Sequence, residues 1–141
     1  MRTDLSIDDL GGLLDEPLLA VLATRRKDDS IMLSPVWFEW YEGGIDIWVP
    51  TIEGGKVSHV QRDPRVTVVV ANHEWPYKGF ELRGDATVSL VPDDFYGVLR
   101  RTALRYSGPE AADRMVGSYA PGAVIRVEPG TIRTWSYEDE A

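Results

Sequence analysis

The sequence of 141 residues contains no cysteine and only two histidines, His59 and His73. The lack of cysteine excludes disulfide bonds, thiolate metal sites, iron–sulfur clusters and cysteine nucleophiles. Because the two histidines are also well separated in the chain, a histidine-rich zinc or iron site is not expected. We therefore predict that the protein holds no metal.

Positive charge and long hydrophobic runs are scarce as well. Fifteen lysines and arginines against 23 acidic residues give a net charge of −8 at pH 7, which argues against a nucleic-acid partner. The longest apolar run, residues 66–71, falls far short of the ~18 residues that a membrane helix needs. Residues 1–15 carry four aspartates and do not resemble a signal peptide. These features predict a cytoplasmic protein with no membrane partner.

Tryptophan, in contrast, is abundant. Five tryptophans, six tyrosines and three phenylalanines make up 10% of the residues. A small domain has limited room for five indoles in one core, and aromatic side chains are enriched at subunit interfaces and around flat ligands. We expect some of the tryptophans to serve such a surface. Neither a linker nor a repeat divides the chain, so residues 1–141 are expected to form a single domain.

Short strands separated by turns dominate the pattern. The alternation of apolar and polar residues is clearest over 80–90, where Gly84 indicates a bulge. The other expected strands cover residues 18–24, 31–41, 45–49, 65–71, 123–127 and 131–137, the last two joined by a turn at 128–130. Six or seven strands joined mostly by hairpins predict an antiparallel barrel rather than a βαβ fold.

Helical spacing appears in four places around these strands. A first helix, capped by Ser6, is expected to bury a face made of Ile7, Leu10 and Leu14. Further helices are expected over residues 56–63, 95–106 and 112–119. We therefore expect short helices at the periphery of the barrel.

The sequence motifs of common hydrolases, kinases and dinucleotide-binding enzymes are absent. The clearest candidate site is the segment 49–59, where a strand ends, hydroxyls and glycines follow, and a helix begins with Lys56. The amides of a helix start, a hydroxyl and an ammonium group together suit an anion such as phosphate. Lysine in this position opposes the helix dipole unless an anion is bound there. A solvated surface lysine is the alternative interpretation.

Two groups of aromatic residues are further candidates. Trp75 and Tyr77 flank Pro76 between two expected strands, where they could line a flat ring, pack across an interface or pack within the turn. Trp37 and Trp40 fall on opposite faces of one expected strand, so at least one of them points away from the core.

Six segments, in order, carry a family resemblance: EPLLAVLAT, LSPVWFEW, GGKVSHVQRDPRVTVVV, WPYKGFELRGDATV, RRTALRYSG and VIRVEPGTIRTW. They resemble the pyridoxamine 5′-phosphate oxidase-like split β-barrels, in the branch of oxidoreductases that depend on the deazaflavin coenzyme F-420. The resemblance covers nearly the whole chain. It implies a mostly β, FMN-binding-type split β-barrel of six to seven antiparallel strands in Greek-key order, with short peripheral helices.

The resemblance also implies a function and a set of site residues. It implies an enzyme that transfers a hydride between coenzyme F-420 and a small organic acceptor, working as a homodimer with the cofactor at the subunit interface. It assigns the cofactor phosphate to Lys56, helped by Thr51 and Ser58. Along the ring it suggests the strand residues Ser34, Pro35, Val36 and Trp37 and, closing the groove from the same or the other subunit, Trp75, Tyr77 and Trp135.

Such a reaction requires no catalytic side chain, which fits the missing acid–base motifs and leaves catalytic residues unassigned. A proton for the product would come from water or from Tyr77. Relatives often carry an arginine near the phosphate lysine, where this chain has Gly54 and Gly55, and asparagine-leucine where it has His59-Val60. The smaller positive charge leaves room for FMN, so an FMN-dependent oxidase or reductase of the same fold is one alternative. A non-catalytic barrel that binds flavin or haem is the other.

Overall fold

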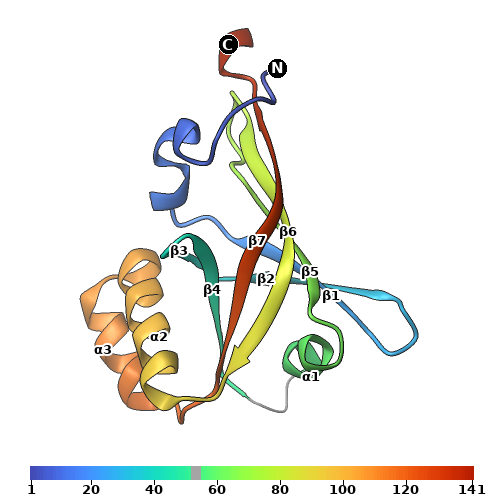
Figure 1. The fold of residues 1–141 in the computed structure, drawn as a ribbon. Helices are drawn as coiled ribbons and strands as arrows, with labels where there is room; N and C mark the ends of the chain where they lie inside the picture. The colour runs from blue at the N-terminus through green and yellow to red at the C-terminus, as the bar shows by residue number, and fades with distance from the viewer. Residues whose placement is uncertain (52–54) are drawn as a thin grey trace.

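Seven antiparallel strands form one curled sheet in the computed structural model, which describes residues 1–51 and 55–141 (Figure 1). The strands run in the order β2-β1-β5-β6-β7-β4-β3 across the sheet. In chain order they are β1 (Ala20–Arg25), β2 (Ile31–Val36), β3 (Glu39–Tyr41), β4 (Gly44–Val49), β5 (Arg65–Ala71), β6 (Lys78–Ser89) and β7 (Ala123–Ser136). The mostly β split-barrel fold predicted from the sequence is confirmed.

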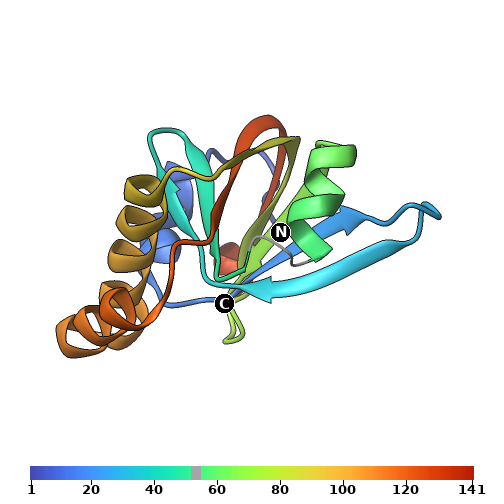
Figure 2. The same cartoon turned by 90° about the horizontal axis from the view of Figure 1, so that it is seen from below.

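Short helices surround this sheet: η1 (Asp8–Asp15), α1 (Gly55–Arg62), α2 (Pro92–Ser107), α3 (Pro109–Ser118) and η2 (Glu138–Glu140). The paired helices α2 and α3 lie on one side of the curled sheet, and α1 lies on the other (Figure 2). In the part of the chain that the structure describes, every helix is too short or too polar to cross a membrane. Gly54, which the sequence analysis places just before α1, lies outside the described residues.

The strands β6 and β7 differ in one respect from the sequence prediction. Two strands joined by a turn at 128–130 were expected, but β7 is a single strand from Ala123 to Ser136. The prediction was wrong because β6 pairs with β7 on both sides of this stretch, with a register shift between Arg83 and Gly84. The bulge that Gly84 predicted therefore accommodates Pro129 and Gly130 within the β6–β7 ladder, and the chain does not reverse there.

The expected strand over residues 31–41 is also divided. Strand β2 ends at Val36 and β3 begins at Glu39, and these two strands lie at opposite edges of the sheet. Trp37 and Phe38 alone connect them, so this connection crosses from one edge to the other.

The first helix winds more tightly than expected. It is a 3₁₀ helix, and Ser6 and Asp9 exchange two hydrogen bonds at its start, from the Ser6 amide at 2.9 Å and from the Asp9 amide at 3.3 Å. Its buried residues are Ile7, Leu10 and Leu13, and the helix is kinked between the last two at Gly11, whose φ of 65° is not helical. Leu13, after the kink, is fully buried, whereas the predicted Leu14 packs against the same core but is only half-buried.

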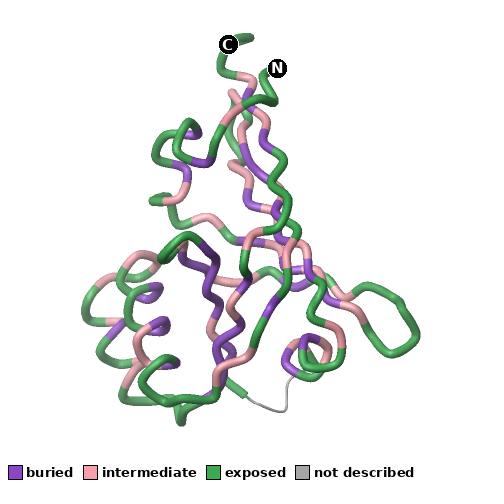
Figure 3. Tube along the Cα trace, in the orientation of Figure 1, coloured by how far each residue is buried: buried purple, intermediate pink, exposed green. Residues whose placement is uncertain are grey.

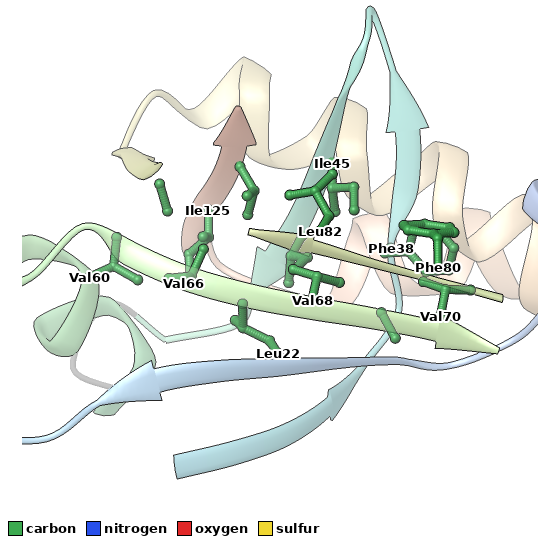
Figure 4. Close-up of a cluster of buried hydrophobic side chains, with 14 of the residues drawn as sticks. Leu22, Phe38, Ile45, Val60, Val66, Val68, Val70, Phe80, Leu82 and Ile125 are labelled. Carbon is green, nitrogen blue, oxygen red and sulfur yellow. The ribbon is translucent and has the colours of Figure 1, made fainter. Parts of the chain in front are cut away.

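Buried and exposed positions alternate along the strands, so one face of the curled sheet encloses the main hydrophobic core (Figure 3). Figure 4 shows the core side chains meeting in this enclosed space, with Val60 of α1 near one end and Phe38 near the other. A second, smaller cluster lies under α2 and consists of Phe95, Val98, Leu99 and Val124. Strand β4 separates the two clusters, because alternate residues of β4 face opposite sides.

The bulge at Gly84 provides a stability test. A Cβ on Gly84 would lie 1.9 Å from the backbone oxygen of Glu128, so a side chain there requires one strand to move. We expect Gly84→Ala to lower the free energy of unfolding by roughly 2–4 kcal/mol, measured by urea denaturation.

The matched control is Gly117→Ala in α3, where nothing lies within 4 Å of the added Cβ. Because alanine favours helix, this variant is expected to gain about 0.5–1 kcal/mol. If the two variants had the same urea midpoint, the close approach of β6 and β7 would not be what Gly84 is needed for.

Candidate functional site

A groove of about 360 Å³ opens beside the carboxyl ends of β2 and β4. Strand β2 and the connection after it contribute Pro35, Val36 and Trp37 to its lining, and β4 with the following residue contributes Trp48, Val49 and Pro50. Lys56 of α1, Met115 of α3 and Tyr119, which follows α3, complete the lining. The groove thus brings together four of the predicted site residues, namely Lys56, Pro35, Val36 and Trp37.

Lys56 owes its place to the amphipathic helix α1. Val57 and Val60 are buried against the main core, which leaves Lys56, in the first turn, half-buried beside the groove. It is the only charged side chain among the groove residues that the structure describes. No acidic residue lies in the first turn of α1, where an anionic side chain would compete with a bound anion for the helix dipole.

His59 lies one helical turn after Gly55 and links the start of α1 to strand β1. Its Nδ1 lies 3.0 Å from Oγ1 of the buried Thr24 in β1, and its ring approaches Gly55. Burial lowers the pKa of His59, and the charges of Arg62 and Arg26 lower it further, so the neutral imidazole is favoured in the folded protein. Sequence analysis did not assign a role to Thr24, because no local pattern links it to α1.

Trp37 is held between two other aromatic rings. It stacks on Tyr106 of α2, with ring centroids 4.7 Å apart and planes 2° from parallel, and meets Trp48 edge-on at 6.0 Å. The Tyr106 hydroxyl accepts a hydrogen bond from the Phe38 amide at 3.3 Å and donates one to the Leu18 carbonyl. The position of Trp37 in the groove is therefore fixed by α2 and not by strand geometry alone.

Trp48, Met115 and Tyr119 are groove residues that sequence analysis missed. Ile47 and Val49 of β4 face the main core, so Trp48 between them faces α2 and α3 instead. Tyr119 meets Trp48 edge-on at 5.4 Å. The only sequence signal was the helical spacing of Met115 and Tyr119, which is equally typical of ordinary helix packing.

Three predicted phosphate or ring residues do not line the groove. Ser34 is buried and faces the interior side of β2, opposite to Pro35. Ser58 is exposed and donates its hydroxyl to the Gly55 carbonyl at 3.0 Å, within its own helix. Thr51 directly follows the groove residue Pro50. Their roles in binding stay predictions.

The second aromatic group lies elsewhere in the chain. Trp75 and Tyr77 are 54% and 47% exposed, and Trp75 packs against Tyr77 and Tyr137 with centroids 5.5 and 5.7 Å away. Trp75 and Tyr77 lie in the β5–β6 connection, and Tyr137 follows β7. The β5–β6 connection lies beside the two termini and at the opposite end of the long strands from α1 (Figure 1). Within one chain the structure does not bring Trp75 and Tyr77 to the groove.

Trp135 and Trp40 also lie away from the groove. Trp135 lines a separate cavity of about 740 Å³ near the N-terminus, with the Arg133 guanidinium 5.0 Å from its ring centroid. Trp40 packs against the main core, edge-on to Phe80 at 6.3 Å. Trp37 and Trp40 therefore contact different parts of the molecule, but not as opposite faces of one strand, because Trp37 lies in the connection between β2 and β3. Within residues 1–51 and 55–141, no cluster of His, Asp and Glu side chains is arranged to hold a metal ion.

A family model described as pyridoxamine 5′-phosphate oxidase matches residues 8–136. Among solved structures, a conserved hypothetical protein of Mycobacterium tuberculosis is similar with a TM-score of 0.82 and 20% identity, over 98% of this chain and 89% of that one. An F-420 reductase has a TM-score of 0.66 and 26% identity, over 86% and 93% of the two chains. The FAD-binding protein of Mycobacterium smegmatis has a TM-score of 0.64 and 17% identity, over 96% and 98%. No curated protein matches the chain.

The environment of His59 predicts a pH dependence of stability. Because folding lowers the pKa of His59, this imidazole binds protons more readily in the unfolded chain than in the folded chain once the pH falls towards ~6.5. The stability that depends on neutral His59 is present above that pH and is lost as the pH falls through the folded-state pKa. We expect the free energy of unfolding to fall more between about pH 7 and pH 5 in the wild type than in His59→Gln.

Urea denaturation at several pH values measures this difference. The matched control is His73→Gln, which removes the exposed histidine of the β5–β6 connection. An identical pH dependence in the wild type and His59→Gln would contradict the lowered pKa of the half-buried His59 in the folded protein.

Proposed function

The chain belongs to the pyridoxamine 5′-phosphate oxidase family, and on that basis we propose that it is a homodimeric oxidoreductase that transfers a hydride between coenzyme F-420 and a small organic acceptor. The observation that carries the proposal is the composition of the groove. One cation, Lys56, stands beside a lining that is otherwise aromatic and apolar in the described residues. A cofactor with a phosphate and a flat ring system has the matching distribution of charge and surface.

The cofactor assignment rests on two further points. The F-420 reductase shares 26% sequence identity with this chain, and the chain has no histidine, cysteine or acidic side chain in the described groove lining. Hydride transfer through a bound cofactor needs orientation, electrostatics and exclusion of water rather than a protein acid or base. The same reasoning admits FMN, so FMN is the alternative that the binding experiment below separates.

The residues of the groove have distinct tasks in this proposal. Lys56 holds the phosphate, and the backbone of Pro35, Val36 and Trp37 runs along one edge of the ring. Trp37, fixed by its stack on Tyr106, and Trp48 exclude water from the ring. When bound, the reduced deazaflavin supplies the hydride, and a proton from water completes the two-electron reduction of the acceptor. Tyr77 stays a proposed proton donor only if it reaches the groove from a second subunit.

The homodimer in this proposal is supported by the outer face of the sheet. Leu33 and Ile31 of β2 are 66% and 46% exposed. On the same face the strand register aligns Pro35 with Val21 of β1, and Val21 with Val69 of β5. Apolar surface of this kind, exposed at Ile31 and Leu33 and half-buried at Val21 and Val69, favours association with another protein surface. Pro35 belongs both to this face and to the groove, so a second copy docked here would border the groove.

The phosphate assignment is tested by Lys56→Ala. Loss of a charge-assisted contact is expected to weaken F-420 binding by about 1–3 kcal/mol, or roughly 5- to 150-fold in the dissociation constant. Fluorescence titration with F-420 and, in parallel, with FMN measures the loss and shows which cofactor the wild type prefers.

Lys27→Ala is the matched control, because Lys27 is an exposed lysine in the β1–β2 turn. We expect it to bind like the wild type. If Lys56→Ala folds normally and binds F-420 with unchanged affinity, the phosphate assignment is wrong. Tight binding of FMN alone would replace F-420 by FMN in the proposal, and binding of neither would leave the enzyme without its cofactor and overturn it.

In the proposed homodimer, Trp75 of one subunit closes the groove that contains Lys56 of the other, and we call this arrangement the shared groove. It is tested with mixed dimers. If each groove combines Lys56 of one subunit with Trp75 of the other, a heterodimer of Lys56→Ala and Trp75→Ala chains contains one groove with both substitutions and one with neither. We therefore expect the purified heterodimer to regain one wild-type F-420 site, which neither variant homodimer has. Differently tagged, co-expressed chains provide the heterodimer, and titration counts its sites.

Two results would contradict the shared groove. A heterodimer with no wild-type site would mean that Lys56 and Trp75 do not meet across the interface. A wild-type protein that sediments as a monomer at all concentrations would remove the homodimer itself.

A further inference from the structure

The outer face of the sheet, opposite the main core, is apolar on one half and charged on the other. Two neighbouring rows of the strand register cross it. The first, which we call the Leu33 row, consists of Leu33, Ala23, Thr67, Arg83 and Thr131. The second, which we call the Pro35 row, consists of Pro35, Val21, Val69, Glu81 and Arg133. Leu22, Val68 and Leu82 lie between the two rows and point into the core instead.

The charged half of this face contains ion pairs that are only loosely formed. One carboxylate oxygen of Glu81 lies 3.6 Å from Nε of Arg83 and 3.6 Å from Nε of Arg133, which is too far for a hydrogen bond. The Glu81 side chain is 21% exposed, whereas both guanidiniums are largely exposed. The three groups therefore keep hydrogen-bonding capacity for a surface that docks on this face.

A second copy of the chain fits this face in one particular register. Two copies that pack through the same surface are related by a dyad, and each contact then occurs twice. Sheets packed face to face keep their strands nearly aligned. A dyad that lies between the two sheets and crosses the strands sets each strand antiparallel to its own copy. If this dyad crosses β6 at Leu82, the Leu33 row of each copy lies opposite the Pro35 row of the other.

The side chains of the two rows then match in kind. Leu33 lies opposite the partner's Pro35, and Ala23 lies opposite the partner's Val21, so apolar groups cover each other. On β6, Arg83 lies opposite the partner's Glu81, and the dyad repeats this pair. Opposite charges thus meet where the face is charged, and apolar groups meet where it is apolar.

The neighbouring registers match less well. A dyad at Arg83 would set two Arg83 guanidiniums against each other, and like charges across an interface oppose binding. A dyad at Gly84 would stack the β6 bulge on its own copy. It would also enclose the adjacent cavity of about 540 Å³, whose lining includes Arg25 and Arg65 as well as Arg83. The charge pattern therefore favours the dyad at Leu82.

The same arrangement agrees with the shared groove. The β5–β6 connection and α1 lie at opposite ends of the long strands (Figure 1). Antiparallel stacking therefore turns the β5–β6 connection of each copy toward the α1 end of the other. The apolar half of the face and the groove edge at Pro35 remain part of one continuous surface.

We infer that a second copy of this chain stacks antiparallel on the outer face and that reciprocal ion pairs between Glu81 of each copy and Arg83 of the other set its register. The inference rests on the proposed function, because it specifies the subunit contact of the same homodimer. The apolar half supplies contact area, but it would allow several registers. Charge complementarity selects one of them.

Charge reversal tests this contact, with the dissociation constant of the dimer measured by sedimentation equilibrium. Glu81→Arg and Arg83→Glu each place like charges opposite each other twice in the homodimer. We expect each variant to weaken the homodimer at least about tenfold. Glu110→Arg and Arg114→Glu make the same charge changes at exposed positions of α3 and are the matched controls, expected to dimerise like the wild type.

Mixing the two variants separates a contact between chains from the contact of Glu81 with Arg83 in its own chain. In a heterodimer of Glu81→Arg and Arg83→Glu chains, both pairs across the interface again join opposite charges. Within each chain, positions 81 and 83 still carry like charges. We therefore expect differently tagged chains to form a heterodimer at least about tenfold tighter than either variant homodimer. A mixture that associates as weakly as the separate variants would overturn the inference.

Asp85→Arg tests the register itself. A dyad at Gly84 would place Arg83 opposite the partner's Asp85, whereas a dyad at Leu82 leaves Asp85 outside the ion pair. We expect Asp85→Arg to weaken the dimer much less than Glu81→Arg does. A dimer that is weakened by Asp85→Arg but not by Glu81→Arg would overturn the inferred register.

The outcomes for this contact and for the proposed function are distinct. If the wild type dimerises and binds F-420 while Glu81→Arg and Arg83→Glu dimerise equally well, the ion pairs are wrong and the proposed function stands. If the charge variants behave as expected but the wild type binds neither F-420 nor FMN, the subunit contact stands and the proposed function fails. A monomeric wild type overturns both.

Discussion

A connection of two residues, Trp37 and Phe38, joins strands that lie at opposite edges of the sheet, and the rest of the architecture depends on it. An extended chain advances at most ~3.6 Å per residue, so the two edges must lie close together and the sheet must curl. Phe38 is fully buried in the core that the curl encloses, while Trp37 enters the groove. Arg105 and Tyr106 bind the backbone of Phe38 from α2 and hold the crossing in place.

Charge attracts a ligand to this protein only over contact distances. The net charge of −8 gives no long-range attraction for an anionic ligand, and charges more than ~10 Å away are largely screened at physiological salt. The proposed anion in the groove would therefore depend mainly on Lys56 itself, the charged side chain in the described lining. A flat ring gains its affinity from the aromatic lining, which salt does not weaken. This division would allow a strongly acidic chain to hold the phosphate-bearing cofactor that we propose.

Local patterns predicted the elements that local contacts control. The alternation over residues 80–90 corresponds to β6, Gly84 corresponds to its bulge, and the spacing over 56–63 corresponds to α1. Prediction failed where pairing with a distant segment decides the outcome. Proline and glycine at 128–130 are typical of a turn, but strand β6 holds this stretch in a continuous ladder. Leu13 is buried more deeply than the predicted Leu14, in a first helix that is kinked at Gly11 rather than regular.

The candidate site divides in the same way. The sequence by itself determined the chemistry that the groove can offer, since Lys56 at a helix start and Trp37 beside a strand are visible in the local pattern, and the lack of cysteine excludes thiol chemistry. Only the tertiary structure decided that Trp48, Met115 and Tyr119 join them and that Trp75 and Tyr77 lie at the other end of the same chain. The physical reason is that sheet order and the curl bring together segments far apart in sequence, and their contacts depend on packing that hydrophobic periodicity does not encode.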